Sequence, residues 1–327
     1  MRVLWTHNFN PEIMNSGVFM HITAEGVRKL GVDLTLLYIG NLRSIDGLLQ
    51  ARKNVRQLAG KYDLIHAQYG SACAVSSAAA KGIPKVLSIR GNDWSVHSNK
   101  LDFHFLHTRL ARFMTRAVIR EYNAIITVSN RIASEVQCLY PNSRIFTIPS
   151  PIDLERFIPL DKERARAALG FPNNNEKWIL FTSLGSNDPV KRISVAKAAV
   201  EKANDRMGNI KLRVATGFDH NTMPLFVAAC DLILCTSETE GWPNSIKEAL
   251  ACNIPFVATD VSDLRDIAKQ EPSCRICPPD TDILAENICD VLSQKTLPDL
   301  RRYVLEMGVP LISRRILDLY KSILAGP

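Results

Sequence analysis

The sequence lacks the long apolar segments of membrane-spanning and secreted proteins. Its smooth apolar runs, such as LTLLYIG at residues 34–40, have the length of a strand, whereas a helix that crosses a bilayer needs about 20 apolar residues. The opening residues, MRVLWTHNFNP, contain no long apolar stretch, so we expect no signal peptide. There is also no low-complexity tract, and the 46% of hydrophobic residues excludes a largely disordered chain.

Metal-ligand patterns are missing as well. The eight cysteines are irregularly spaced, and the one C-x2-C pair, Cys274 and Cys277, has neither a second pair nor histidines to complete a zinc site. Several other cysteines lie in apolar patterns, where cysteine behaves as a small hydrophobic residue. The sequence therefore predicts no metal, no cofactor and a protein of the reducing cytoplasm.

Acidic residues do not balance the basic residues in the first half of the chain. Residues 1–155 hold 18 Lys and Arg against 11 Asp and Glu, whereas residues 156–327 hold 22 of each, so the first half carries the whole net charge of +7. Unless it is simply a basic, solvated surface, this half should meet a polyanion, an anionic membrane face or an acidic substrate. No aromatic-basic module or recognition helix is present, so nucleic acid is not an expected partner.

Short apolar runs alternate with helical patterns in both halves. The expected strands are RVLWTH, VDLTLLYIG, DLIHAQYG, PKVLSIRG and AIITVSN in the first half, and WILFTSLG, KLRVATG, DLILCTS and IPFVATD in the second. Between them, three prolines in FTIPSPIDLERFIP predict an interdomain connection. This order predicts an α/β protein with two doubly wound domains, residues 1–155 and 156–306, and a final helix within residues 307–327.

One segment of the second half carries two glutamates. In SETEGWPNSIKEAL, residues 237–250, Glu240 follows a buried strand and Glu248 lies inside the next helix. Glu248 lies about 160–200° around the helix from Ile246 and Leu250, so it is not a core position and can point into a cleft. Ligands bind beyond the carboxyl ends of parallel strands, and carboxylates accept hydrogen bonds strongly from sugar hydroxyls. The alternative is an ordinary solvated glutamate.

The start of the same helix favours an anion. Pro243 suits the first helical position, where a missing N–H costs nothing. The amides of Asn244 and Ser245 are then free donors at the positive end of the helix dipole. Carboxylates beside an anion site suit a nucleotide sugar, which has ribose hydroxyls at one end, a diphosphate in the middle and sugar hydroxyls at the other.

The segment TSETEGWPNSIKEALACNIPFVATDVSDL resembles the E-x7-E signature of glycosyltransferase family 4. Other pieces resemble the family in the right order: YDLIHAQYG, AIITVSN, IPSPIDLERFIP, LGSNDPVKR and the terminal RRILDLYKSIL. The resemblance covers most of the chain and implies a GT-B fold, in which two Rossmann-like domains face each other across a cleft. The first domain then binds the acceptor, the second binds the nucleotide sugar, and the last helix packs back toward the first domain.

The resemblance also implies residue roles. Glu248 would hold the ribose hydroxyls, and Glu240 would hold hydroxyls of the donor sugar and help to place its anomeric carbon. Lys191 matches the family's phosphate-binding lysine, and a cation there stabilises the negative charge that the leaving diphosphate gains. Further donor-binding residues expected from the resemblance are Arg192, Ser186, Gly17, Gly241, Trp242, Asn244 and Ser245.

Two motifs depart from the family pattern. The loop before the lysine usually contains Gly-Arg, and here it reads Gly185-Ser186-Asn187-Asp188, so Arg192 is our candidate for the missing charge. The usual His-Gly-x-Asp of the first domain is Arg90-Gly91-Asn92-Asp93. Arg90 and Asp93 are therefore expected substrate-binding residues, but Arg90 cannot act as a base.

A basic helix is expected within FHFLHTRLARFMTRAVIREY. Four arginines, Arg109, Arg112, Arg116 and Arg120, fall within about 80° of one helical face, beside an apolar stripe of Leu106, Leu110, Phe113 and Ala117. This pattern favours a face toward anionic lipid or a lipid-diphosphate acceptor, with peripheral association at the inner face of the plasma membrane. The alternative is a helix that packs through its apolar stripe and leaves the arginines in water.

Together these features predict a retaining, metal-independent glycosyltransferase. It would move a sugar from a nucleoside diphosphate to a hydroxyl of a glycan or lipid-linked acceptor in bacterial surface polysaccharide synthesis. Two alternatives remain at this point: a nucleotide-sugar epimerase or hydrolase of the same fold, and a non-catalytic, polyanion-binding partner subunit.

Overall fold

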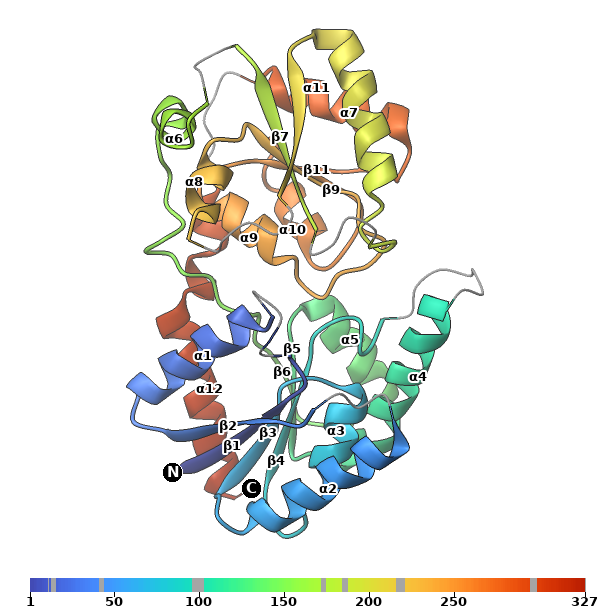
Figure 1. Cartoon of the computed structure of the whole chain (residues 1–327), viewed down its shortest axis with the longest axis vertical. Coiled ribbons are helices and arrows are strands. Elements are labelled where there is room, and N and C mark those ends of the chain that lie inside the picture. The colour runs from blue at the N-terminus through green and yellow to red at the C-terminus, as the bar shows by residue number, and fades with distance from the viewer. Residues whose placement is uncertain are drawn as a thin grey trace. The chain divides into compact units, whose positions relative to one another are not determined.

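The computed structural model divides the chain into two compact units (Figure 1). Unit 1 comprises Met1–Pro151 and Val309–Pro327, and unit 2 comprises Ile152–Gly308. The structure describes residues 1–10, 12, 16–40, 44–95, 103–171, 175–183, 188–215, 221–294 and 299–326, without the side chains of residues 103 and 104. In each unit the described strands form one parallel sheet with helices between successive strands, which confirms the α/β class.

The sheet of unit 1 has the strand order β2-β1-β3-β4-β5-β6, and every pairing is parallel. All residues of the three central strands β3, β4 and β5 are buried, as expected for a parallel sheet that is covered on both faces. The strands are β1 (Arg2–His7), β2 (Asp33–Tyr38), β3 (Leu64–Ala67), β4 (Lys85–Ile89), β5 (Ala124–Thr127) and β6 (Ile145–Thr147).

Helices cover the two faces of this sheet. The helices of unit 1 are α1 (Val18–Lys29), α2 (Ile45–Ala59), α3 (Ser71–Ser77), α4 (Phe103–Val118), α5 (Asn130–Leu139) and α12 (Val309–Leu324), with a 3-10 turn η1 (Ile119–Glu121). Apolar side chains of α1 and α12 share one core with the strands. Figure 1 shows α2, α3 and α4 on the opposite side of the sheet.

The last helix is joined to the sheet of unit 1 by a buried hydrogen-bond network. The indole N–H of Trp5 donates to the hydroxyl of Tyr320 over 2.8 Å. The Tyr320 hydroxyl lies 2.5 Å from Nδ1 of His66, and Nε2 of His66 lies 2.8 Å from the Ser88 hydroxyl. Because Trp5 donates to the Tyr320 hydroxyl, that hydroxyl can donate in turn to Nδ1 of a neutral His66 that carries its proton on Nε2. Burial lowers the pKa of His66 well below its usual value, with a smaller effect from the charge of Arg90.

We expect Tyr320→Phe to lower the free energy of unfolding by about 1–3 kcal/mol, because it leaves the buried Trp5 donor and the His66 acceptor without a partner. Urea denaturation, followed by a probe in unit 1, measures the change. Tyr303→Phe is the matched control, since the hydroxyl of the half-buried Tyr303 accepts from Arg302 in an exposed hydrogen bond. Equal stability of Tyr320→Phe and wild type would contradict the assignment of the network.

Unit 2 has the strand order β11-β10-β9-β7-β8, again parallel throughout. Its main core lies between this sheet and two helices, α7 and α11. The strands are β7 (Lys177–Thr182), β8 (Ile210–Ala215), β9 (Leu232–Cys235), β10 (Phe256–Ala258) and β11 (Arg275–Ile276). The helices are α6 (Lys162–Ala168), α7 (Ile193–Met207), α8 (Met223–Ala228), α9 (Asn244–Ala251), α10 (Leu264–Ala268) and α11 (Thr281–Leu292), with 3-10 turns η2 (Arg301–Tyr303) and η3 (Leu305–Met307).

In both sheets the order in which successive strands are added reverses at the same position. Counted from the first strand of each unit, the order is 2-1-3-4-5, with a sixth strand added in unit 1. The chain therefore changes direction between β1 and β3 in unit 1, and between β7 and β9 in unit 2. In open α/β sheets this switch point, at the carboxyl ends of the strands, is where ligands bind.

Two short edge strands and one helix boundary differ from what the sequence predicted. Strand β6 lies partly inside the proline-rich segment that was expected to connect the domains, and β11 has only two residues. Pro243 is not the first residue of a helix: it has an extended backbone with ψ 116° and is the N-cap of α9. Gly31 follows α1 with a φ of +85°, the left-handed conformation typical of a glycine beyond a helix end.

The C-x2-C pair lies inside unit 2. Cys274 and Cys277 are buried, and burial raises the pKa of their thiols to about 12 and about 11, so both are neutral core residues near pH 7. In the described part of the chain, no group of three His, Cys, Asp or Glu side chains is placed to hold a metal ion. None of the described helices combines the length and the hydropathy of a membrane span.

Candidate functional site

The switch point of unit 2 brings Lys191 and Glu240 together. Lys191 lies in the connection from β7 to α7, and Glu240 in the loop from β9 to α9. The two loops are linked by Thr236, whose hydroxyl donates to the backbone carbonyl of Lys191 over 2.7 Å. The backbone N–H of Glu238 also donates to the carbonyl of Val190. Residues 49 positions apart in the sequence therefore share one rigid site.

Lys191 and Glu240 form an ion pair with an Nζ–Oε1 distance of 2.5 Å. The hydroxyl of Ser237 donates to the same carboxylate oxygen over 2.7 Å. Both charged side chains are largely buried, with 22% and 17% of their surfaces exposed. Burial is the largest single effect and lowers the pKa of Lys191, but the charge and hydrogen bond of Glu240, together with Cys235 and Asp188, outweigh it, so the pKa is raised. Lys191 is therefore a fixed cation at the edge of the sheet.

Arg192 lies at the same edge and holds the β9 loop. Its Nε donates to the carbonyl of Thr236 over 2.6 Å and its Nη2 to the carbonyl of Ser237 over 2.7 Å. Its backbone is left-handed, with φ 52° and ψ 51°, an uncommon conformation for a residue other than glycine and one often found at functional sites. Burial lowers the pKa of its guanidinium. Arg192 thus adds positive charge beside Lys191 while two of its donors fix the loop.

The N-terminus of α9 lies next to the ion pair. Gly241 is buried, and its carbonyl accepts from the hydroxyl of Ser262 over 2.6 Å. The Trp242 side chain is also buried, so its indole serves the fold rather than an open surface. Asn244 is exposed and Ser245 is half-buried at the first turn, where the N–H groups have no helical partner. This turn has the free amides and the dipole that bind an anion.

Glu248 lies one turn further along α9. It is half-buried, whereas its neighbours Ala249 and Leu250 are fully buried. Burial raises its pKa to about 7, and the charges of Lys247 and Arg156 reduce that increase. A carboxyl group near its midpoint of ionisation at physiological pH gains its full charge when hydroxyl or amide donors are added.

Gly17, at the switch point of unit 1, is restricted to glycine for two reasons. Its φ is +69°, which side chains rarely tolerate. A Cβ there would also lie 2.8 Å from Cβ and Cγ of Phe9. The chain therefore turns into α1 with its backbone directly against an aromatic ring.

Arg90 and Asp93 make extensive contacts within unit 1. The Arg90 guanidinium donates to the carbonyl and the amide oxygen of Gln68 and, over 2.9 Å, to the Ser150 hydroxyl. The fully buried carboxylate of Asp93 accepts from the backbone N–H groups of Gly70, Arg90 and Gly91. Both residues thus organise the loops at the carboxyl edge of the unit 1 sheet.

The other expected residues are more dispersed. Ser186 lies outside the described residues. Arg109, Arg112 and Arg116 lie on α4, but Arg120 belongs to the following 3-10 turn, because the α-helix ends at Val118. Five further residues of the site were not predicted from the sequence: Ser237, Thr236, Ser262, Lys247 and Arg156. Only the first two carried a usable signal, as polar residues directly after a buried strand.

The two parallel sheets share one strand order, and the switch point of the second sheet holds a cation, a carboxylate and a helix N-terminus. These features define a glycosyltransferase of the GT-B type. Known proteins agree: residues 3–156 match the model of Glycosyltransferase Family 4, and residues 179–294 match that of glycosyl transferases group 1. The two matches together span most of the chain and support a glycosyltransferase of family 4.

Individual proteins are similar to this chain in sequence or in fold. A protein of Bacillus subtilis strain 168, provisionally named the teichuronic acid biosynthesis glycosyltransferase TuaC, is 24% identical over 88% of both chains. Among solved structures, sucrose-phosphate synthase from Thermosynechococcus elongatus superimposes with a TM-score of 0.79 at 16% identity, covering 100% of both chains. The Anabaena protein HepE, solved with UDP and glucose, has a TM-score of 0.73 at 18% identity, covering 98% of this chain and 100% of its own.

Proposed function

We propose that this protein is a retaining, metal-independent hexosyltransferase. It transfers a sugar from a nucleoside diphosphate to a hydroxyl of a glycan or lipid-linked acceptor in bacterial surface polysaccharide synthesis. The observation that carries the proposal is the Lys191–Glu240 pair beside the N-terminus of α9 at a switch point. The name of the Bacillus subtilis relative supports the class of product, and the nucleotide in HepE supports the class of donor.

The donor fits the order of charges along α9. The diphosphate takes the first-turn amides near Asn244 and Ser245, together with the positive charge of Lys191. The ribose hydroxyls donate to Glu248, and hydroxyls of the transferred sugar donate to Glu240. When no donor is bound, the ion pair neutralises Glu240, so this carboxylate does not repel the incoming diphosphate.

Among the site residues, the cation Lys191 contributes most to the transfer step. Transfer breaks the bond between the anomeric carbon and a phosphate oxygen, and negative charge collects on the departing diphosphate. A preorganised cation stabilises that charge more in the transition state than in the bound donor, which is the condition for lowering the barrier. Arg192 contributes to the same positive field, and Glu240 holds the sugar for displacement.

The proposal is tested with a panel of UDP, GDP, ADP and CMP sugars. A correct donor at 100 times its dissociation constant should stabilise the fold by about 2.7 kcal/mol, and thermal shift detects it. Incubation with donor and an acceptor mixture should then yield a product with the anomeric configuration of the donor, read by NMR. Conversion of the donor without acceptor would instead indicate an epimerase or hydrolase, and absence of any donor binding would contradict the proposal.

Donor affinity should depend on pH through Glu248. Since its carboxyl has a pKa of about 7 and ribose hydroxyls donate to the ionised form, we expect the dissociation constant to rise about tenfold from pH 8 to pH 6. An intact nucleotide sugar must be used, because the terminal phosphate of a free nucleoside diphosphate titrates in this range.

The control for this prediction is Glu248→Gln. The variant should bind the donor weakly at both pH values, because its amide cannot ionise. Calorimetric titration of wild type and variant at pH 6, 7 and 8 separates the two. An equal pH dependence in both proteins would place the titrating group elsewhere.

A further inference from the structure

Helix α4 packs on unit 1 through its small side chains. Thr108, Ala111 and Thr115 are buried. The Thr115 hydroxyl donates to backbone carbonyls of the helix and of Asp93, and accepts from the backbone N–H of Ser71. The fully buried positions of this helix are therefore small or polar residues.

Three large apolar side chains of α4 face outward. Leu106, Leu110 and Phe113 are 58%, 56% and 69% exposed. At about 100° per residue, they lie roughly opposite the buried face. The alternative interpretation of the sequence, a helix packed through this stripe, is therefore wrong. An apolar stripe on the outermost side of a helix is unusual for a surface that meets only water.

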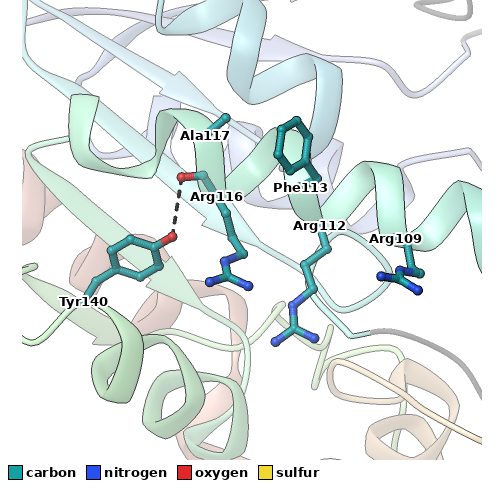
Figure 2. Close-up of a pocket in the computed structure, with 6 residues that line it drawn as sticks. All are labelled: Arg109, Arg112, Phe113, Arg116, Ala117 and Tyr140. Atoms are coloured by element: carbon teal, nitrogen blue, oxygen red, sulfur yellow. Dashed lines mark hydrogen bonds between the residues drawn. The ribbon is translucent and has the colours of Figure 1, made fainter.

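Arginines flank the apolar stripe. Figure 2 shows the guanidinium groups of Arg109, Arg112 and Arg116 on one side of α4, with Phe113 and Ala117 on the other. With Phe113, Ala117 and Tyr140 these arginines line a pocket of about 610 Å³. Arg112 lies 5.4 Å from the Trp94 ring, and among the described residues its buried Nε has no hydrogen-bond partner.

No acidic residue in the helix itself offsets this charge. The sequence from Phe103 to Arg120 contains no Asp or Glu. Within the described ranges, Arg109, Arg112 and Arg116 take part in no ion pair. A solvated basic helix gains from acids three or four residues away, and their absence leaves three guanidinium groups for an external anion.

We propose that this face of α4, formed by Leu106, Leu110, Phe113, Arg109, Arg112 and Arg116, docks on a membrane that contains anionic phospholipids. The apolar stripe enters the boundary between headgroups and acyl chains, and the arginine pocket takes a lipid phosphate. A phosphate binds guanidinium groups in a bidentate manner, and a lipid supplies phosphate and apolar surface together. An anionic glycan or a free phosphate satisfies only the arginines. The proposal is independent of the transfer chemistry.

Vesicle flotation tests the proposal with the full chain. Vesicles of phosphatidylglycerol and phosphatidylcholine in equal parts should carry the protein upward, whereas pure phosphatidylcholine vesicles should leave most of it behind. Removing two charges with Arg109→Gln/Arg116→Gln should lower the partition coefficient about 30-fold, or five- to sixfold per arginine. Leu110→Ser/Phe113→Ser should lower it at least tenfold even at low salt.

The matched control is Lys53→Gln/Lys61→Gln, which removes two exposed charges elsewhere on unit 1. It should change partitioning less than threefold. All variants should keep the wild-type melting temperature and the wild-type shift with a nucleotide sugar, so a failure of docking is separable from a failure of the donor site. Three results would overturn the proposal: equal binding to neutral vesicles, an equal loss in the control, or stabilisation by inorganic pyrophosphate without vesicle binding.

Discussion

Replacement of Lys191 by alanine should lower kcat for sugar transfer by about 10²- to 10³-fold, equivalent to roughly 2.7–4 kcal/mol of transition-state stabilisation. The reason is geometric. Lys191 is fixed by Glu240 at 2.5 Å in a site where only about a fifth of either side chain is exposed, so its charge is preorganised and weakly screened. Single-turnover measurements with saturating donor isolate this effect on the chemical step.

The control for Lys191→Ala comes from the same unit. Lys202 forms a 2.6 Å ion pair with Asp282 on the surface between α7 and α11. Lys202→Ala removes the same charge from a solvated pair and should leave kcat within a factor of two. If Lys191→Ala raised only KM, with kcat unchanged, the lysine would bind donor and transition state equally, and its assignment to the leaving group would be wrong.

Glu240→Gln should lower kcat by about 10²-fold or more while preserving the shape of the site. The amide can still accept from Ser237, but it cannot neutralise Lys191 or accept as strongly from sugar hydroxyls. A displacement of the sugar by about 1 Å is enough for a loss of this size. Without its partner Lys191 remains buried, so the pKa of the lysine should fall and the pH–rate profile should change shape.

The matched control is Asp282→Asn, which neutralises an acid of an exposed Lys–Asp pair. It should alter neither kcat nor the pH–rate profile. A double-mutant cycle of Lys191→Ala with Glu240→Gln should be strongly non-additive, because the two side chains share one contact. Additive effects would contradict the view that the pair acts as a unit.

The longer helices and strands can be predicted because the spacing of apolar residues along the sequence indicates which side chains are buried. Strands such as β1 and β9 are apolar runs between turn signals, and the structure has them within the expected segments. The edge strands cannot be predicted in this way. β6 is only half-buried and is followed by prolines, and β11 has two residues, so neither leaves a long apolar run.

For the proposed donor site, the sequence indicates the candidate residues but not the contacts between them. Lys191, Glu240 and Glu248 were expected from the resemblance and from their place after strands. That Lys191 contacts Glu240 depends on the pairing of β7 with β9, which is a long-range property of the sheet. For Arg90 the sequence suggested a different kind of partner from those that it contacts in the structure. Its charge suggests an external anion, but its donors are directed to Gln68 and Ser150, which no local sequence pattern indicates.

The return of α12 to the first unit has a consequence during synthesis on the ribosome. Ile312, Ile316 and Tyr320 complete the apolar core of unit 1, yet they are made after all of unit 2. A nascent chain that ends near Gly308 therefore exposes the α12-binding face of its sheet, while unit 2 already has every residue of its own core. Unit 2 can therefore complete its fold before unit 1, although N-terminal domains usually fold first during synthesis. Unit 1 can complete its core only after the final helix has been made.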